Sequence, residues 1–357
     1  MRSLFLLFFT VIFFASCDDN QVYKKKITGS AGEVIVIIPK QLWDGKPGKI
    51  IRETLAQPQL ALNQDEPIFN LISIPPEAFK EIFQSNRNII QTKISPLVEN
   101  PGVIFINDVW AAPQATVHVN ARDNEEFEKL YNENYMKIIG YFLKAEKDRL
   151  MGIYAKNFET SVYNTLYDKY GIKLHVPPGF VVAEEYKDFI WIRHNTPKIE
   201  QSIMLYWLPY DSDSVFTANY LINKRDSVLK INVPGPTKGS YMTTERKVNL
   251  LYQVTKHNTN YAVEMRGLWK VQNDFMGGPF VMLAELDAYN KRVVIAEGYV
   301  YAPSMDKRNY VRQLEAMIYS MNFKDQDKNN KINIQLDMIA DIKSDREKAA
   351  QDSAKTN

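Results

Sequence analysis

An apolar run near the start of the chain reads GEVIVII over residues 32–38 and ends at Pro39. Its β-branched residues follow one another without polar interruption, which is typical of a strand buried on both faces of a sheet. Proline has no N–H to donate to a strand ladder, so Pro39 ends the run. The pattern predicts a central strand, and the elements around it decide what covers that strand.

Strand and helix patterns alternate around this run. Pro47 fits the first turn of an amphipathic helix over 47–57, and Pro75-Pro76-Glu77 starts a second helix that runs to Phe83. Further strand patterns lie at 69–74, 87–94, 103–106 and 115–121. These elements predict an N-terminal α+β domain over residues 31–122.

The longest helical pattern covers residues 123–170. Asp123 is suited to an N-cap, and Glu126 three residues later completes an acidic capping box. Apolar side chains recur at three- and four-residue spacing, and Gly171 is suited to a C-terminal cap. A single helix of this length is unusual in a globular domain, so we expect connecting helices with a bend near Gly152.

The remaining patterns predict a second α+β domain over residues 171–323. Its expected strands lie at 172–176, 189–194, 202–208, 248–256, 260–270, 279–287 and 292–301, and its expected helices at about 212–229 and 306–321. Beyond 323 the chain turns polar, and the alternation of Ile332, Ile334 and Leu336 suggests an edge strand or arm before a disordered tail that ends at residue 357. The fold class is therefore α+β, with two α+β halves, mixed or antiparallel sheets, and a long, broken helical segment between them.

Composition excludes several classes of protein. The 357 residues are enough for two domains, and the net charge of +2 gives no electrostatic footprint for nucleic acid. The single cysteine rules out an intramolecular disulfide or a multi-cysteine zinc site. Hydrophobic content of 45% argues against general disorder.

The first 16 residues have the pattern of a secretory signal peptide. Arg2 supplies a positive start, and residues 4–14 form an apolar segment of 11 residues. As a helix this segment would span about 16 Å, against about 30 Å of hydrocarbon in a bilayer. It is therefore too short to cross a membrane and fits a cleaved signal.

Cys17 follows the small residues Ala15 and Ser16, and Phe14-Ala15-Ser16-Cys17 resembles the bacterial lipobox, in which the cysteine is acylated. Each buried methylene would contribute roughly 0.8 kcal/mol, and two or more chains would hold the protein stably on a bilayer. The alternative is an ordinary cleavage site followed by a free cysteine. Residues 17–30 would then be the lipidated cysteine and its tether. Asp18-Asp19-Asn20 resemble a surface-export signal, or they are simply part of the solvated tether.

Several motifs together resemble a family of Bacteroidetes envelope lipoproteins that is known only as a domain of unknown function. These motifs are Cys17-Asp18-Asp19, Val176-Pro177-Pro178-Gly179-Phe180, Trp191-Ile192-Arg193-His194, Pro234-Gly235-Pro236 and Gly239-Ser240-Tyr241-Met242. The resemblance covers about 30–323. It implies an outer-membrane location, facing the periplasm or the cell surface, and no assigned activity or catalytic residue. The Asp-Ser-x sequences at 213, 226 and 352 also resemble an O-glycosylation pattern of these bacteria.

Common enzyme and cofactor motifs are absent from the sequence, which has no phosphate loop, dinucleotide fingerprint, nucleophile elbow or zinc-protease helix. Asp325, Asp327 and Asn329 imitate the start of a calcium loop. The sixth position is Asn330 rather than glycine and the twelfth is Leu336 rather than glutamate, so we expect a solvated turn. No cofactor and no metal are predicted.

His175 and His194 are the candidate catalytic residues. If the strands that carry them pair, the two rings would meet in one cleft with Asp188 or Glu185, and a histidine–carboxylate pair could perform general acid–base chemistry. The alternative is that both are ordinary surface histidines. His118 and His257 have no evident partner in the sequence.

Trp191, Trp207, Tyr210 and Trp269 are the candidate ligand-binding residues. They fall on neighbouring expected strands, where outward-facing rings would stack on sugars or on a partner and inward-facing rings would be core. Because successive strand residues point to opposite faces, Tyr206 and Trp207 cannot share one face.

Three functions follow as alternatives. The first is a lipid-anchored, non-catalytic binding or assembly module, with the membrane as partner through the acyl chains on Cys17 and an envelope protein or glycan as ligand. The second is an envelope hydrolase acting on glycan or peptidoglycan through the two histidines. The third is a glycan-capture lipoprotein that uses the aromatic strands. Whether the chain is an enzyme is left open, with the balance against it.

Overall fold

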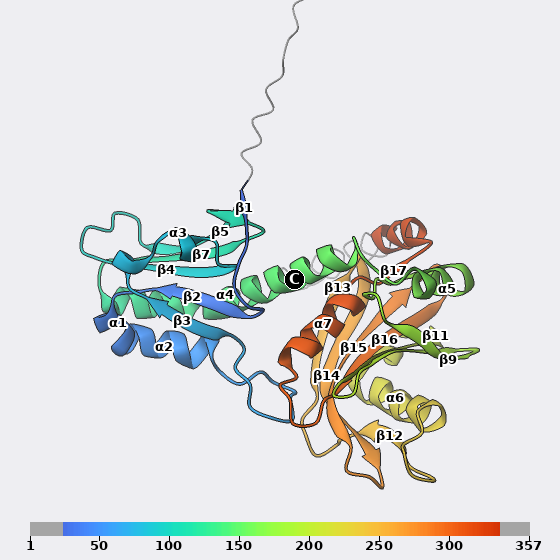
Figure 1. Ribbon diagram of the computed structural model, residues 1–357. Helices are drawn as coiled ribbons and strands as arrows, with labels where there is room; N and C mark the ends of the chain where they lie inside the picture. The colour runs from blue at the N-terminus through green and yellow to red at the C-terminus, as the bar shows by residue number, and fades with distance from the viewer. Residues whose placement is uncertain (1–23, 336–357) are drawn as a thin grey trace, which may run out of the picture.

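The computed structural model of the chain describes residues 24–335, whose two large sheets are connected by a long helix (Figure 1). Cys17, the expected signal peptide and residues 336–357 lie outside the described residues. Within residues 24–335, none of the helices combines the length and the apolar character needed to cross a membrane.

The first sheet is mixed. Its strands, in spatial order, are β3 (Asn70–Ile74), β2 (Glu33–Ile37), β4 (Asn88–Ile94), β7 (Ala115–Ala121) and β5 (Gly102–Asn107). The first four run parallel, and β5 pairs antiparallel with β7 at the edge. The apolar run that opens the sequence is β2, next to the centre of the sheet, with four of its five residues buried.

The two faces of the first sheet are covered unequally. Helix α2 (Lys46–Leu55), preceded by α1 (Lys40–Asp44), and the long helix α4 (Asn124–Tyr154) pack on one face over buried residues such as Val36, Val117 and Phe142. The other face carries the connection from β3 to β4, with the short η1 (Pro76–Ala78) and α3 (Glu81–Gln84), and Trp110 from the segment between β5 and β6. That connection packs on Ile35, Ile74 and their neighbours.

Helix α4 begins as the sequence predicts. The Asp123 side chain accepts a hydrogen bond from the Glu126 backbone N–H at 2.8 Å, and the Glu126 carboxylate accepts one from the Arg122 N–H. The break in the helical segment comes at residues 155–159, just beyond Gly152, which stays helical. The second helix, α5 (Thr160–Tyr170), ends at Gly171 in the left-handed conformation with φ 67°.

The second sheet is antiparallel and has eight strands. In order they are β12 (Tyr241–Thr244), β14 (Asn260–Gln272), β15 (Gly277–Asp287), β16 (Arg292–Tyr301), β11 (Glu200–Pro209), β10 (Phe189–Asn195) and β9 (Val181–Tyr186), and β13 (Leu251–His257) also pairs with β14. Alternation along β11 places Ile203 and Leu205 on one face and Met204 and Tyr206 on the other. The antiparallel ladder therefore carries two cores.

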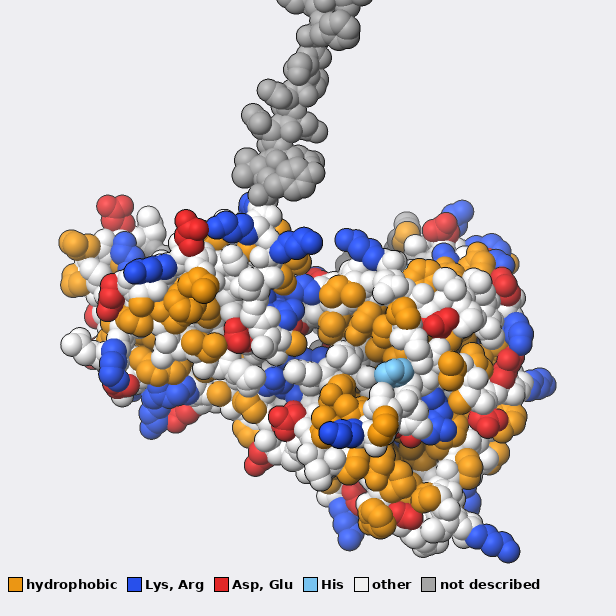
Figure 2. Space-filling model, viewed as in Figure 1, with side chains coloured by type: hydrophobic (Ala, Val, Ile, Leu, Met, Phe, Trp, Pro, Cys, Tyr) orange, Lys and Arg blue, Asp and Glu red, His pale blue; other side chains and the backbone are white. Residues whose placement is uncertain are grey.

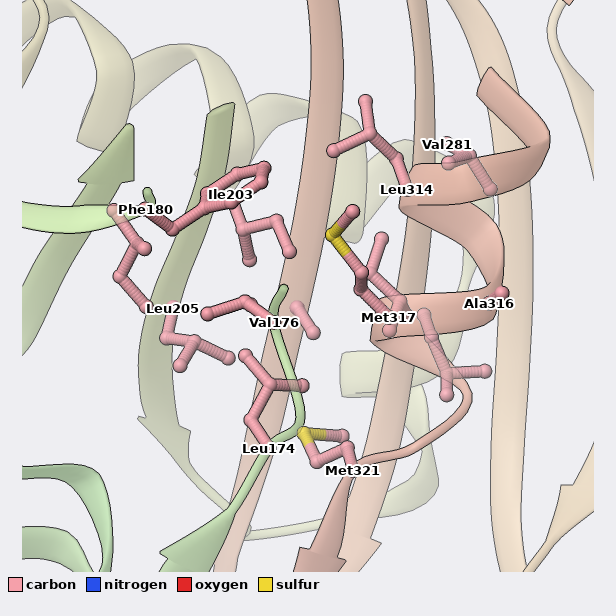
Figure 3. Close-up of a cluster of buried hydrophobic side chains, with 14 of the residues drawn as sticks. Leu174, Val176, Phe180, Ile203, Leu205, Val281, Leu314, Ala316, Met317 and Met321 are labelled. Atoms are coloured by element: carbon pink, nitrogen blue, oxygen red, sulfur yellow. The ribbon is translucent and has the colours of Figure 1, made fainter. Parts of the chain in front are cut away.

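Helices cover both faces of the second sheet. Helices α5 and α7 (Arg308–Ile318) cover one face, where Leu314 and Met317 pack against Ile203 and Leu205 (Figure 3). Helix α6 (Ala218–Asn232), preceded by η2 (Asp213–Phe216), covers the other face. Beneath α6, the wholly buried Arg225 donates to Glu297 from both Nε (3.0 Å) and Nη2 (2.6 Å).

Helix α7 connects the two halves of the molecule. It has no side-chain cap of its own, and Glu66 from the first half accepts hydrogen bonds from the Lys307 and Arg308 backbone N–H groups at 2.6 and 2.8 Å. Arg312 Nη2 donates to the Ile68 carbonyl at 2.6 Å. The same helix packs against α4.

These elements confirm the α+β class, with one mixed and one antiparallel sheet and a broken helical segment between them. Two expectations about individual elements were wrong, and two strands of the second sheet were not predicted. The strand expected at 172–176 is reduced to β8 (Ile172–Lys173), which pairs with β17 (Asn322–Phe323), and the strands β9 and β12 were not expected. Residues 326–335 are helical instead of forming an edge strand, because their amides find partners in the second half, as with buried Asn329, which donates to Asp287. The domain boundaries themselves stay a prediction.

Candidate functional site

The two candidate catalytic histidines lie in separate aromatic surroundings. The His175 ring stacks on Tyr163 at 5.4 Å between centroids and contacts Phe158 at 4.7 Å. Burial, followed by the charge of Lys173, lowers the pKa of His175. The His194 ring stacks on Phe180 at 5.3 Å.

The strand pairing on which the catalytic hypothesis depended does not occur. The segment with His175 pairs with β17, whereas β10, with His194, lies between β9 and β11. The expected carboxylate partners are engaged elsewhere, since Glu185 accepts from Lys169 and Asp188 accepts from the indole of Trp207. Within residues 24–335, no bond joins either imidazole to these carboxylates.

Three of the four candidate aromatic residues lie in two separate sites, and Tyr210 lies in neither. Trp191 and Trp269 are buried, with 7% and 2% of their surface exposed, and both belong to the core beneath α6. Trp207 points to the opposite face of the sheet, beside Tyr170. Tyr210 donates from its hydroxyl to Asp213 at 2.6 Å.

Trp191 and Trp269 line a pocket of about 350 Å³, which we name the aromatic pocket. It crosses one face of the second sheet from β12 to β9, beyond the end of α6. Its lining comprises Glu184, Trp191, Arg193, Glu200, Val233, Pro234, Gly235, Pro236, Met242, Trp269, Val271, Met276, Tyr299 and Tyr301. A mainly apolar lining with a few fixed polar groups is typical of small-molecule sites, and this volume lies at their lower limit.

A charged pair forms one end of the aromatic pocket. Arg193 Nη2 donates to Glu200 Oε2 at 2.9 Å, and Glu200 Oε1 accepts from the hydroxyls of Ser202 (3.1 Å) and Tyr299. Burial, reinforced by the Glu200 carboxylate, raises the pKa of the Tyr299 phenol far above its ordinary value. The Arg193 guanidinium also lies over the Trp191 indole at 4.6 Å, so its position is fixed from two sides.

Two buried N–H groups of this pocket have no partner. Neither Trp191 Nε1 nor Arg193 Nε has a hydrogen-bond acceptor among residues 24–335. The indole of Trp269, by contrast, donates to the Val300 carbonyl at 3.3 Å. A buried donor left unsatisfied costs about 1–3 kcal/mol, so an acceptor atom in the pocket would be favoured by both groups.

The loop with the Pro-Gly-Pro motif is held tightly at the other end of the pocket. Ser240 Oγ donates to the Thr237 carbonyl at 2.6 Å, and the Gly235 N–H donates to the Ser240 carbonyl at 2.9 Å. A Cβ on Gly235 would lie 2.3 Å from Ser240 Oγ and 2.5 Å from Val271 Cγ1, so only glycine fits there. The motif singled out in the sequence therefore builds one wall of the pocket.

A second cleft, of about 510 Å³, surrounds Trp207, and we name it the Trp207 cleft. It is lined by Tyr170, Gly171, Asp188, Trp207, Leu208, Pro209, Asn290, Lys291, Arg292 and Asp325. The Trp207 indole donates to Asp188 at 3.0 Å, and its ring lies 4.8 Å from that of Tyr170. This cleft is more polar than the aromatic pocket, with both acidic and basic side chains at its rim.

A histidine–carboxylate pair does exist, at a position the sequence did not indicate. His257 Nδ1 lies 2.8 Å from Glu285 Oε2, and its Nε2 lies 2.9 Å from the Tyr319 carbonyl. Both side chains are buried and both ring nitrogens are occupied, so the pair has a structural role. The two side chains come together because β13 pairs with β14 and β14 pairs with β15. No local sequence motif predicts this contact.

In the described part of the chain, no group of three or more His, Cys, Asp or Glu side chains is placed to hold a metal ion. Of the residues that imitate a calcium loop, Asp325 forms an ion pair with Lys328 at 2.9 Å and Asn329 is buried.

Comparison with known proteins finds family models without an assigned function. Residues 28–155 match a domain of unknown function, DUF8532, and residues 159–320 match another, DUF4837. The resemblance to domains of unknown function is thereby confirmed, although two models and not one cover the expected region. The bacterial source and the lipoprotein character stay predictions. The sequence matches no curated protein.

Solved structures give only distant likenesses. The Ran-binding protein Mog1p of Saccharomyces cerevisiae aligns with a TM-score of 0.30 and 10% identity, over 43% of this chain and 90% of its own. A protein of unknown function from Pseudomonas aeruginosa aligns with a TM-score of 0.25 and 14% identity, over 41% and 87%. Scores this low support no inference about function.

Proposed function

We propose that this chain is a lipid-anchored envelope protein that binds a ligand in the aromatic pocket and catalyses no reaction. The anchor would be the acylated Cys17, as the lipobox-like sequence predicts. The observation that carries the binding function is the pair of buried, partnerless donors Trp191 Nε1 and Arg193 Nε in one pocket.

The pocket favours a ligand with an apolar body and an oxygen acceptor. Met242, Met276 and the Pro-Gly-Pro loop offer apolar contacts, and the two N–H groups on β10 offer hydrogen bonds to a carboxylate or carbonyl. Trp191 and Arg193 are two residues apart on β10, so their side chains project to the same face of the sheet.

Binding is tested with N-acetylated amino acids and their uncharged amides as probes. We expect the apolar acids to raise the thermal midpoint of the protein more than their amides do. Trp191→Phe, which removes the indole N–H, and Arg193→Met should each abolish that difference. Trp207→Phe is the matched control and should respond as the wild type. The pocket is not the binding site if the acids and amides differ by the same amount in all four proteins, or if no protein shows a difference between them.

Anchoring is tested separately. Cells labelled with a palmitate analogue should incorporate it into the wild type and not into Cys17→Ser. Equal incorporation into both proteins would rule out the lipid anchor while leaving the pocket untouched.

A second candidate function, glycan capture, is favoured by the Trp207 cleft. Its half-buried aromatic rings lie beside Asp188 and Asn290, a combination of stacking surface and hydrogen-bonding groups that suits sugar hydroxyls. Titration with N-acetylglucosamine oligosaccharides checks this. Trp207→Ala should then remove the heat of binding and Trp191→Phe should not. The hydrolase is not proposed, because His175 and His194 do not share a cleft with a carboxylate.

A further inference from the structure

The first described residues, which include β1, lie on the side of the first sheet that carries α3. The strand β1 (Lys25–Lys26) pairs with β6 (Ala111–Ala112), and Lys25 Nζ forms an ion pair with Glu81 of α3 at 3.0 Å. The Thr28 N–H donates to the Ser85 carbonyl just after α3. In Figure 1, β1 and α3 lie at the same end of the molecule. The polypeptide that leads back to Cys17 therefore leaves the body beside α3.

The distance from Cys17 to this point is short. Seven residue steps separate Cys17 from Lys24, and a fully extended chain spans at most about 25 Å over that length. If Cys17 carries acyl chains, as the proposed function requires, the α3 side of the first sheet is the part of the body held nearest to the bilayer.

Apolar side chains are exposed on this side. The register places Ile72 beside Ile35 and Ile104 beside His118, so both project to the face on which α3 lies. Ile72 is 42% exposed and Ile104 is 47% exposed, and Ile82 on α3 itself is 77% exposed. No element among residues 24–335 covers these three side chains fully.

Basic side chains accompany the apolar ones. Lys93 projects to the same face from β4, and Lys24, Lys25 and Lys80 are exposed around α3, against the acidic Glu77 and Glu81. Figure 2 shows Lys and Arg side chains on this part of the surface. Each lysine near an anionic membrane surface contributes about 1 kcal/mol. Apolar residues ringed by lysines suit the interface of an anionic bilayer.

We propose that the α3 side of the first sheet rests on the bilayer that holds the acyl chains of Cys17. Ile82 and Ile104 enter the interface, and the lysines meet anionic headgroups. The aromatic pocket is then presented away from the membrane, because the strand β12 and its loop lie at the opposite end of the molecule from β1 (Figure 1).

The test measures how fast single cysteines react with a membrane-impermeant maleimide. Ile82→Cys and Ile104→Cys report on the proposed contact. Ile231→Cys and Phe275→Cys are matched controls, because these side chains are 80% and 94% exposed and lie away from α3. Each is made in the full lipoprotein, reconstituted into vesicles of phosphatidylethanolamine and phosphatidylglycerol, and in an unanchored Cys17→Ser background in solution.

We expect residues 82 and 104 to react several-fold more slowly on vesicles than in solution, and residues 231 and 275 to react equally in both. If Cys17 is blocked and all four positions react equally fast on vesicles, membrane docking is wrong although the anchor exists. If Cys17 itself reacts in the wild type, the anchor is wrong. If residues 82 and 104 react more slowly in solution as the protein concentration rises, a second copy of the chain covers this surface. That result would overturn the proposal.

Discussion

The two sheets of this molecule differ in how completely their faces are covered. The antiparallel sheet of the second half has helices on both faces, and nearly every residue of β15 and β16 is buried. The sheet of the first half has long helices on one face and only short segments, around α3 and Trp110, on the other, so isoleucines on β3, β5 and α3 stay exposed. A mainly parallel sheet is ordinarily covered on both faces, and this one is not.

This difference in coverage determines which surfaces of each half a ligand or a membrane can reach. The closed sheet leaves a ligand the aromatic pocket, beyond the end of α6, and the Trp207 cleft. The open sheet leaves part of one face exposed, and we propose that this face contacts the membrane. The comparison also predicts that the closed half tolerates change at its sheet–helix interfaces less well than the open half.

The largest effect is expected at the buried ion pair of the closed half. Arg225→Met leaves Glu297 unpaired in a site where both side chains have no exposed surface, which should lower the free energy of unfolding by about 3–5 kcal/mol. Urea denaturation measures this. The matched control Arg122→Met breaks an exposed pair with Glu126 and should cost less than about 1 kcal/mol.

A smaller effect is expected at the buried charges of the open half. Arg149→Met removes bonds to Glu146, to Asn88 Oδ1 and to the Pro113 and Arg87 carbonyls, but Glu146 keeps a 2.7 Å bond from Asn88 and an ion pair with Arg87. Because no buried charge is left unpaired, we expect a loss below the roughly 3–5 kcal/mol of Arg225→Met. A loss larger than that of Arg225→Met in the same denaturation experiment would contradict the comparison.

Two glycine substitutions should have opposite signs. In the closed half, a Cβ on Gly298 would lie 2.9 Å from Leu314 Cβ, so Gly298→Ala should destabilise by about 1–3 kcal/mol. In the open half, nothing lies within 4 Å of a Cβ on the exposed helical Gly140, and Gly140→Ala should stabilise by about 0.5–1 kcal/mol. Thermal unfolding of the two variants checks the signs.

The smallest effect concerns pH. Burial alone would lower the pKa of His257, but the bonds to Glu285 and to the Tyr319 carbonyl outweigh it and raise that pKa above its ordinary 6.5. The folded state therefore binds the proton more tightly, and the stabilisation is complete below about pH 6.5 and is lost as pH rises through the raised value. The midpoint difference between wild type and His257→Gln should shrink from pH 6 to pH 9. If the midpoint difference stays constant from pH 6 to pH 9, protonation of His257 does not contribute to the stability of the fold.

Local signals in the sequence predicted most of the fold. The β-branched run over 32–38, the Asp123–Glu126 capping box and Gly171 each specify structure within a few residues, and the structure has them as expected. The polar segment after Phe323 could not be interpreted in this way. Its amides look solvated in sequence, but Asn329 is buried because Asp287 and the Tyr289 N–H satisfy it.

The candidate site was less predictable, because it depends on strand order. Trp191 and Trp269 belong to β10 and β14, which meet only through the three strands between them in the sheet. The Pro-Gly-Pro motif was visible in the sequence, but nothing local says which side chains it covers. His175 and His194 were expected to meet because the strands that carry them were expected to pair. Instead, β8, just before His175, pairs with β17, and β10, which carries His194, pairs with β9.

The cap on α7 has a consequence for the order of assembly. Glu66 is among the first described residues to be synthesised, and it holds the amide ends of the last long helix. The second half alone leaves the first-turn N–H groups of α7 without this cap, because Glu66 lies about 240 residues earlier in the chain. Closure over so long a stretch slows folding.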